Sequence, residues 1–190
     1  IEEVKKYYQI DFKEYGILIF HPVTTELNSL NEQIQNLVSA GIESNDNFVV
    51  IYPNNDTGTN IILDEYKKIS KNKKFRIFPS LRFKYFLTLL KNTNYIIGNS
   101  SAGIREAEVY GVPTINVGSR QRNRSENEEI INIEAIKKII LKSIKEVKKK
   151  KNVPISNFSK NFDSARKFYE LLCDEKIWKV SFQKQFIDFS

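Results

Sequence analysis

The sequence predicts an α/β fold built on a doubly wound parallel sheet, and three observations lead to this prediction. Short apolar runs recur along the chain, and stretches with apolar residues at helical spacing separate them. Because the runs are apolar on both faces, helices must cover both sides of the sheet that they form. With 190 residues, of which 41% are hydrophobic, the chain is long enough to bury one substantial core.

The predicted strands are the apolar runs themselves. The first two, GILIF at 16–20 and FVVIY at 48–52, are continuous apolar segments that end at a polar loop. Three further runs follow the same rule, and we expect strands at 75–78, 95–97 and 114–117. The apolar piece at 130–133 adds an edge strand.

Helical patterns fill the intervals, at about 26–40, 60–70, 83–91 and 102–110, and two final helices are expected near 136–150 and 162–173. In the first of the final helices, Ile136, Ile140 and Ile144 recur at helical spacing beside many lysines. We interpret the basic run at 137–151 as the solvated face of an amphipathic helix. Nucleic-acid binding is the alternative interpretation, but no recognisable nucleic-acid-binding motif surrounds the run.

Composition excludes several classes of protein. The single cysteine, Cys173, excludes an internal disulfide framework, and we expect it to be a small buried hydrophobe. No apolar run approaches the roughly 18–20 residues needed to span a bilayer, and no signal-peptide pattern opens the chain. We therefore expect a cytoplasmic protein with no membrane partner. The chain contains no methionine, even at position 1, so we expect it to be part of a longer protein.

The loops after the predicted strands are polar, and they fall where ligands bind in such sheets. The loops read HPVTTE, PNNDTGTN, GNSSAG and GSRQRNR, and each follows the carboxyl end of a strand. Ligands of open α/β sheets bind beyond these ends. The first loop contains His21, the only histidine in the chain. A lone histidine at a strand end is more often structural, but its convergence with three other polar loops favours a functional role.

The NSSAGIRE segment is typical of an anion site. Ser100 and Ser101 are suitable caps for the following helix, and Ala102 and Gly103 are small enough to let a ligand approach its first N–H groups. Arg120, after the next strand, can bind phosphate oxygens with its guanidinium group. These features favour a diphosphate, although an ordinary capped helix is the alternative.

Glu106, one turn into the predicted helix, has no role in a site for phosphate alone. A carboxylate can accept hydrogen bonds from the two hydroxyl groups of a ribose. Glu106 is therefore consistent with a nucleoside diphosphate.

The segments IGNSSAGIREAEVYGVPTINVGSRQ, FHPVTTE and YPNNDTG together resemble the C-terminal half of the hydrolysing UDP-N-acetylglucosamine 2-epimerases. This family includes bacterial sialic-acid and legionaminic-acid pathway enzymes and the epimerase half of an animal bifunctional epimerase/kinase. The resemblance runs in order over about 15–124 and more loosely through the C-terminal helices. FHPVT resembles the hydrolysing branch, because the non-hydrolysing branch has arginines after the histidine.

The resemblance implies a Rossmann-like C-terminal half of a two-domain enzyme of the glycosyltransferase-B type. Residues 1–14 would be an interdomain segment, and 15–190 a UDP-binding domain with C-terminal helices. In the family, UDP-N-acetylglucosamine loses UDP by elimination, water adds to the resulting 2-acetamidoglucal, and N-acetylmannosamine leaves, without a metal or other cofactor. The acids and bases lie chiefly in the N-terminal domain, which this sequence does not contain. We therefore expect this chain alone to be inactive.

The resemblance also implies the roles of individual residues. His21 would be the catalytic contribution of this half, close to the diphosphate. The residues implied to bind UDP are Asn54 in the cleft, Leu81 and Phe86 at the uracil, Ser100, Ser101 and Gly103 at the phosphates, Glu106 at the ribose and Arg120 near the phosphates.

One position departs from the family pattern. Asn123 stands where the family often has glycine in the loop after the fifth strand. Asparagine tolerates a left-handed conformation better than most residues, so we expect the loop to keep its course.

Two other function classes remain open from the sequence: the donor-binding half of a glycosyltransferase of the same architecture, and a non-catalytic UDP-binding module. The HPVT loop argues against the glycosyltransferase, because a domain that only positions UDP does not need that histidine. The sequence leaves open the choice between N-acetylglucosamine and its 2,4-diacetamido analogue, the choice between UDP and GDP, and the oligomeric state, a homo-oligomer included.

Overall fold

A six-stranded parallel sheet with strand order β3-β2-β1-β4-β5-β6 forms the centre of the fold. The strands are β1 (Gly16–Ile19), β2 (Phe48–Ile51), β3 (Phe75–Phe78), β4 (Tyr95–Gly98), β5 (Thr114–Val117) and β6 (Ile131–Ile133). Every neighbouring pair is parallel, which confirms the predicted α/β class. The computed structural model describes residues 1–125, 127–149 and 164–179.

The chain starts the sheet in the middle and builds it outward in both directions. It runs from β1 to β2 and β3, then returns to place β4 on the other side of β1. In sheets of this topology, ligands bind beyond the carboxyl ends of the strands at the point where the strand order reverses, here between β1 and β4. This topological switch point is where the sequence places HPVTTE and GNSSAG.

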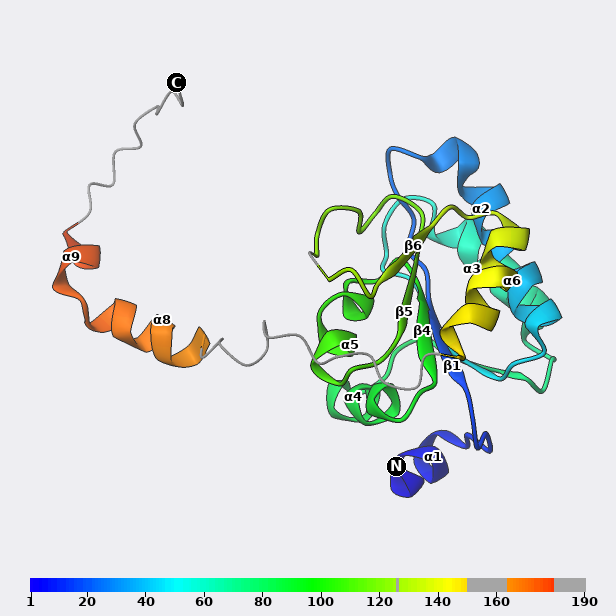
Figure 1. The fold of residues 1–190 in the computed structure, drawn as a ribbon, viewed down its shortest axis with the longest axis horizontal. Helices are drawn as coiled ribbons and strands as arrows, with labels where there is room; N and C mark the ends of the chain where they lie inside the picture. The colour runs from blue at the N-terminus through cyan, green and yellow to red at the C-terminus, as the bar shows by residue number, and fades with distance from the viewer. Residues whose placement is uncertain (126, 150–163, 180–190) are drawn as a thin grey trace. The chain divides into compact units, whose positions relative to one another are not determined.

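Helices cover both faces of the sheet (Figure 1). One layer consists of α2 (Leu27–Ser44), α3 (Thr59–Ile69) and α6 (Lys137–Val147). The other layer consists of α1 (Glu2–Tyr8), α4 (Phe83–Lys91), the 3₁₀ turn η1 (Ser101–Gly103) and α5 (Glu106–Val109). The alternating side chains of the strands supply one core to each layer.

The central strands are buried on both faces, as their unbroken apolar runs predict. Leu18 of β1 points into the core beneath α2 and α3, whereas Ile17 and Ile19 point into the core beneath α1 and α4. All three are at most 5% exposed. Burial of each such side chain contributes about 1.5–3 kcal/mol, so the positions of the strand ends are firmly determined.

The helix predicted at 102–110 differs from the observed structure. It is divided into η1 and the four-residue helix α5. The Thr114 hydroxyl of β5 donates a hydrogen bond to the Gly103 carbonyl at 2.7 Å. A Cβ atom at position 103 would lie 2.9 Å from Thr114 Cγ2. Close packing of this turn on β5 therefore accompanies the break in the helix.

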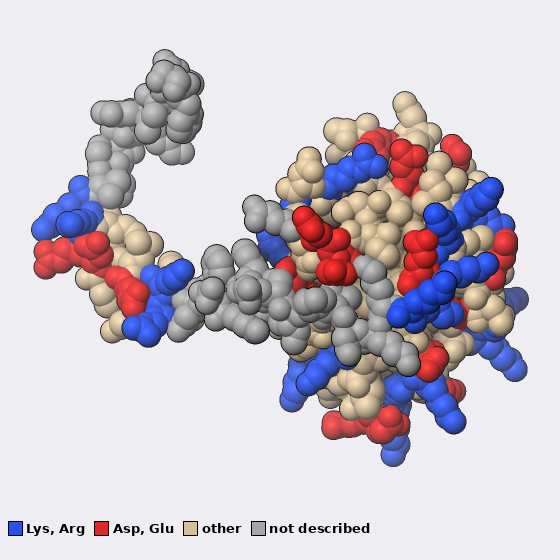
Figure 2. Space-filling model, in the orientation of Figure 1, with Lys and Arg blue, Asp and Glu red and all other residues tan. Residues whose placement is uncertain are grey.

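The basic side chains of α6 face solvent, as expected for an amphipathic helix. Ile140, Ile144 and Val147 are buried, whereas Lys137 pairs with Glu43 at 2.7 Å and Lys142 lies 3.7 Å from Glu146. Figure 2 shows acidic side chains among the basic ones on the visible side of the molecule. Exposed pairs of this kind contribute little to stability and favour solubility. No helix among the described residues is long and apolar enough to cross a membrane.

The chain divides into two compact units, Ile1–Ser156 and Asn157–Ser190. The described part of the second unit consists of α8 (Ser164–Cys173) and α9 (Glu175–Trp178). Trp178 Nε1 donates to the Leu172 carbonyl at 2.9 Å, which joins the two helices. Cys173 is exposed, so the expectation that it is buried was wrong. Apolar residues at helical spacing predict a helix, but they do not show whether its apolar face packs against other elements.

Candidate functional site

The loop after β1 is joined to the loop after β4 by a pair of buried hydrogen bonds. The backbone N–H of His21 donates to Asn99 Oδ1 at 2.7 Å, and Asn99 Nδ2 donates to the His21 carbonyl at 2.8 Å. His21 is 7% exposed and Asn99 is 1% exposed. The two hydrogen bonds bridge the switch point and fix the backbone that carries the histidine.

The imidazole of His21 is fixed by the loop after β2. The backbone N–H of Asn54 donates to His21 Nδ1 at 3.0 Å, while the Asn54 side chain is exposed. Burial and the positive charge of Arg120 lower the pKa of His21 from 6.5 to about 4, although Asp56 acts in the opposite direction. The histidine is therefore uncharged at neutral pH.

Two side chains from the loop after β5 bind the backbone of Asn99. Arg120 Nη1 and Gln121 Nε2 donate to the Asn99 carbonyl at 3.2 and 3.1 Å. Burial lowers the pKa of Arg120 and so does Arg124, whereas Asp56 raises it. The loops after β1, β2, β4 and β5 therefore meet in one set of contacts, which we call the His21 network: His21, Asn54, Asn99, Arg120 and Gln121.

Sequence reasoning missed two residues of this network, Gln121 and Asn99, of which Asn99 binds His21 directly. Its loop was identified, but the side chain was not selected, because its partners lie 78 positions away in the sequence. The sequence does contain one indication of this role, the glycine that precedes Asn99. Gly98 has φ of 132°, and a Cβ atom there would lie 1.9 Å from the Ile19 carbonyl oxygen. Only glycine permits this close approach of β4 to β1, which brings Asn99 to His21.

The turn that follows Asn99, residues 100–103, is named the serine turn here. Ser100 Oγ accepts a hydrogen bond from Ala102 N–H at 3.3 Å, and the Ser100 carbonyl accepts one from Gly103 N–H at 3.1 Å. Within the described ranges, the N–H groups of Ser100 and Ser101 donate to no protein acceptor. Such free backbone donors are suited to an anion.

The serine turn corrects part of the reasoning from sequence. Gly103 was expected to be small so that a ligand could approach the N–H groups. The space that a side chain at position 103 would need is instead occupied by Thr114 of β5. The N–H group of Gly103 already donates to the Ser100 carbonyl. The free donors belong to Ser100, which caps the 3₁₀ turn η1, and to Ser101, the first residue of that turn.

Glu106, the first residue of α5, has a carboxylate oxygen without a partner. Its Oε2 atom is buried and accepts no hydrogen bond from any described residue. A buried acceptor without a donor costs about 1–3 kcal/mol. A ligand that donates a hydrogen bond to Glu106 would remove this cost.

The two residues expected at the uracil lie in the same core layer as the serine turn. Leu81, after β3, and Phe86 of α4 are half-buried and pack against the cluster that contains Ala102. Helix α4 also contacts α5, the short helix that begins at Glu106. The structure therefore places these two side chains on the side of the sheet where the serine turn lies.

In the loop after β5, the residue that departs from the family pattern has a backbone conformation typical of glycine. Asn123 has φ of 60°, the left-handed conformation that glycine adopts most easily. Earlier in the loop, Ser119 Oγ donates to a carboxylate oxygen of Glu26. Gln33 Nε2 donates to the other oxygen at 3.2 Å. Glu26, which the sequence did not single out, thus joins the loop that carries Arg120 to the start of α2.

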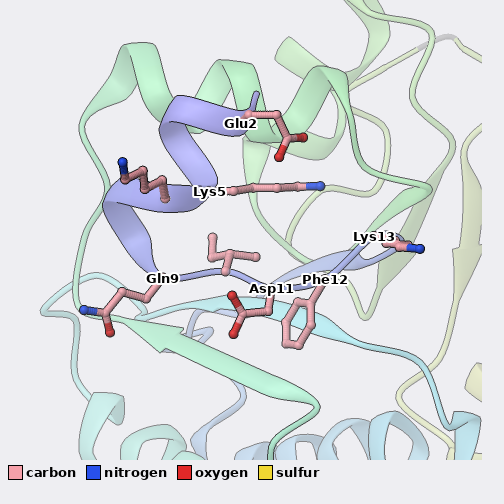
Figure 3. Close-up of a pocket in the computed structure, with 8 residues that line it drawn as sticks. Glu2, Lys5, Gln9, Asp11, Phe12 and Lys13 are labelled. Atoms are coloured by element: carbon pink, nitrogen blue, oxygen red, sulfur yellow. The ribbon is translucent and has the colours of Figure 1, made fainter.

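Of two surface hollows in the described part of the chain, one shares residues with these loops and the other does not. One has a volume of about 320 Å³ and borders the site, with Glu26, Ser119 and Arg122 among its lining residues. The other, of about 640 Å³, is lined only by residues that precede β1, including Lys5, Asp11 and Lys13 (Figure 3). None of the loops after the strands contributes to it. Among the described residues, no group of three histidine, cysteine or acidic side chains could hold a metal ion.

Comparisons with known proteins agree in assigning one relationship. A family model described as UDP-N-acetylglucosamine 2-epimerase matches residues 1–172. A Neisseria meningitidis serogroup B protein named UDP-N-acetylglucosamine 2-epimerase is 44% identical over 191 residues, which cover 99% of this chain and 50% of that protein. A Legionella pneumophila protein named UDP-N,N'-diacetylbacillosamine 2-epimerase (hydrolyzing) is 31% identical over 160 residues, or 84% of this chain and 42% of that protein.

Solved structures share the fold. The UDP-GlcNAc 2-epimerase of Methanocaldococcus jannaschii in complex with UDP-GlcNAc and UDP superposes with a TM-score of 0.69 at 20% identity, over 91% of this chain and 49% of that one. A solved structure of a UDP-GlcNAc 2-epimerase from Neisseria meningitidis bound to UDP-GlcNAc gives a TM-score of 0.63 at 18% identity, over 92% of this chain and 50% of that one. The chain thus spans about half the length of the relatives that it matches.

Proposed function

The chain belongs to the UDP-N-acetylglucosamine 2-epimerase family, and from this premise we propose that it forms the UDP-binding half of a hydrolysing 2-epimerase. The substrate would be UDP-N-acetylglucosamine or its diacetamido analogue. Curated relatives named for the hydrolysing reaction support this reading. The HPVT loop, with proline rather than arginine after His21, supports it as well.

One observation carries the proposal: the site has free hydrogen-bonding groups of the kinds that UDP would use. Ser100 and Ser101 offer backbone N–H groups, and Glu106 offers a buried acceptor. Arg120 is bound to the carbonyl of Asn99, the residue before the serine turn. A diphosphate would accept from the N–H groups and Arg120, and a ribose would donate to Glu106.

The chemistry follows from where charge develops. When the bond between sugar and diphosphate breaks, negative charge collects on the departing UDP, and donors placed there stabilise it. His21 and Arg120 would supply this stabilisation, with Leu81 and Phe86 at the uracil and Asn54 in the cleft. The carboxylates that move protons at the sugar would come from the other half of the protein, so the chain alone would bind UDP weakly and catalyse nothing.

The proposal is tested by titrating the 190-residue chain calorimetrically with UDP, GDP and inorganic pyrophosphate. We expect binding of UDP and weaker binding of pyrophosphate, because the latter lacks the ribose and uracil. Absence of UDP binding would contradict the assignment of this half. Epimerisation by the isolated chain would contradict the division of labour between the halves.

The hydrolysing reaction is tested in the two-domain protein. A hydrolysing enzyme releases free UDP and a free N-acetylmannosamine-type sugar in equal amounts, and no acceptor is required. A non-hydrolysing epimerase would keep the sugar attached to UDP, and a glycosyltransferase would need an acceptor before UDP appears. Product analysis by NMR therefore separates the three activities.

A further inference from the structure

The hydrogen bond between Asn54 and His21 determines which ring nitrogen carries the proton. Asn54 N–H donates to Nδ1 at 3.0 Å. A nitrogen that accepts a hydrogen bond bears no proton, so the proton of the neutral ring lies on Nε2. Within the part of the chain that the structure describes, Nε2 makes no hydrogen bond. The ring therefore holds one N–H donor that is free for a ligand.

We propose that His21 is a neutral hydrogen-bond donor to the departing diphosphate through Nε2–H, and that the Asn54 peptide sets this tautomer. The inference rests on the UDP-binding function proposed above. Under it, the diphosphate oxygen that gains charge accepts a hydrogen bond, while the imidazole keeps its proton throughout. His21 would thus stabilise charge without acting as an acid.

The surroundings of the ring oppose the charged alternative. Protonation at Nδ1 would set one N–H group against another, because Asn54 N–H already points at that nitrogen. Arg120, from the loop after β5, repels a second positive charge, and Asp56, from the loop after β2, is the acidic group that favours one. Asn99, from the loop after β4, is neutral. Burial adds to the effect of Arg120, which agrees with the lowered pKa of about 4.

The chain suits a direct test because it contains a single histidine. A long-range ¹H–¹⁵N correlation spectrum of the tag-free, ¹⁵N-labelled chain shows only one imidazole. At pH 7 we expect a pyridine-type Nδ1 and a pyrrole-type Nε2. With saturating UDP the tautomer should persist while the Nε2 signal shifts. A ring protonated on Nδ1, either as the other tautomer or as imidazolium, would overturn the proposal.

Two substitutions at one position test the role of the peptide. Asn54→Pro removes the backbone N–H group, whereas Asn54→Ala removes the polar side chain and keeps the backbone N–H group. We expect the Nδ1-H tautomer to appear in the proline variant only. Appearance of that tautomer in neither variant would contradict the role of the Asn54 peptide. If the proline variant does not fold, the spectrum of the unmodified chain still decides the tautomer.

Turnover of the two-domain protein separates a donor from an acid. The amide nitrogen of glutamine can occupy the place of Nε2–H, but glutamine cannot transfer a proton as an acid. We expect His21→Gln to retain at least about tenfold more turnover than His21→Ala, since one well-placed donor has an effect of that order or more. Equal loss of turnover in both variants would favour proton transfer by His21 over hydrogen-bond donation. Failure of UDP to bind would contradict the proposed function but leave the tautomer result standing.

Discussion

The His21 network and the serine turn are adjacent in the fold but differ in how their polar groups are satisfied. In the network, the backbone N–H and carbonyl of His21 bind the Asn99 side chain at 2.7 and 2.8 Å, and the Asn54 N–H group binds His21 Nδ1. His21 Nε2 and the buried Gln121 Oε1 of the network are left without a partner among the described residues. In the serine turn and the helix that follows it, two N–H groups and a buried carboxylate oxygen have no partner among the described residues.

This difference separates what the protein arranges by itself from what a ligand would complete. Groups bonded within the fold are held in place before any ligand arrives, so their removal should damage stability and geometry. Groups without a partner are stabilised only when a ligand supplies one, so their removal should chiefly change affinity. Substitutions in the two regions should accordingly have different effects.

The largest effect is expected from His21→Ala in the two-domain protein. The fixed ring is lost, so turnover should fall by about 10²–10⁴-fold, the usual range for a positioned catalytic group. Steady-state release of UDP measures the effect, and circular dichroism checks that the variant is folded. Turnover close to that of the unmodified protein would return His21 to a structural role.

Asn99→Ala should break the network itself. Two buried hydrogen bonds disappear, and the N–H and carbonyl of His21 are left buried without partners. We expect the free energy of unfolding to fall by about 3–4 kcal/mol. Urea denaturation of the chain measures the change. Asn92→Ala is the matched control, because its side chain is exposed and donates one hydrogen bond at 2.8 Å to Thr88. Equal losses in both variants would contradict the role given to Asn99.

The lowered pKa of His21 should make the stability of the network depend on pH. The unfolded chain binds a proton at pH 6.5, whereas the folded chain binds it only near pH 4. The contribution of neutral His21 to the free energy of unfolding is therefore fully present above about pH 6.5. The free energy of unfolding falls by about 3 kcal/mol as the pH decreases to 4. His21→Gln, which does not titrate, should lose this component while the carboxylates continue to titrate. Parallel curves of unfolding free energy against pH for the two proteins would contradict the shift.

The fold could be predicted because it depends on local patterns. Apolar runs mark strands such as Gly16–Ile19 and Thr114–Val117, and each can be read within a few residues. The left-handed conformation at Asn123 follows from the residue type. His21 was identified from the sequence because it follows a strand, and strand ends meet at one edge in a parallel sheet.

The internal arrangement of the site could not be predicted in the same way. The partners of Asn99 are 78 positions away, and several asparagines near strand ends have the same local appearance. Gly103 was interpreted as an opening for a ligand, yet the space beside it is occupied by Thr114. Sequence indicates that a glycine is needed, but only the packing shows which neighbour requires it.

The smallest effect is expected from Glu106→Gln, and it tests the ligand side of the comparison. If the free Oε2 atom receives a ribose hydroxyl, removing the charge should weaken UDP binding by about 1–2 kcal/mol, the usual contribution of a charge-assisted hydrogen bond. Pyrophosphate has no ribose, so its affinity should stay the same. Calorimetric titration of the unmodified chain and the variant with both ligands measures the difference.

A deoxygenated ligand shows whether the ribose and Glu106 act on each other. The unmodified chain should bind 2′,3′-dideoxy-UDP more weakly than UDP, and Glu106→Gln should then cause no further loss, because the hydrogen bond is already absent. Equal weakening of UDP and pyrophosphate in the variant would mean that Glu106 supports the serine turn instead. In that case the free carboxylate oxygen would belong to the fold, and the contrast with the hydrogen-bonded groups of His21 and Asn99 would hold only for the N–H groups of Ser100 and Ser101.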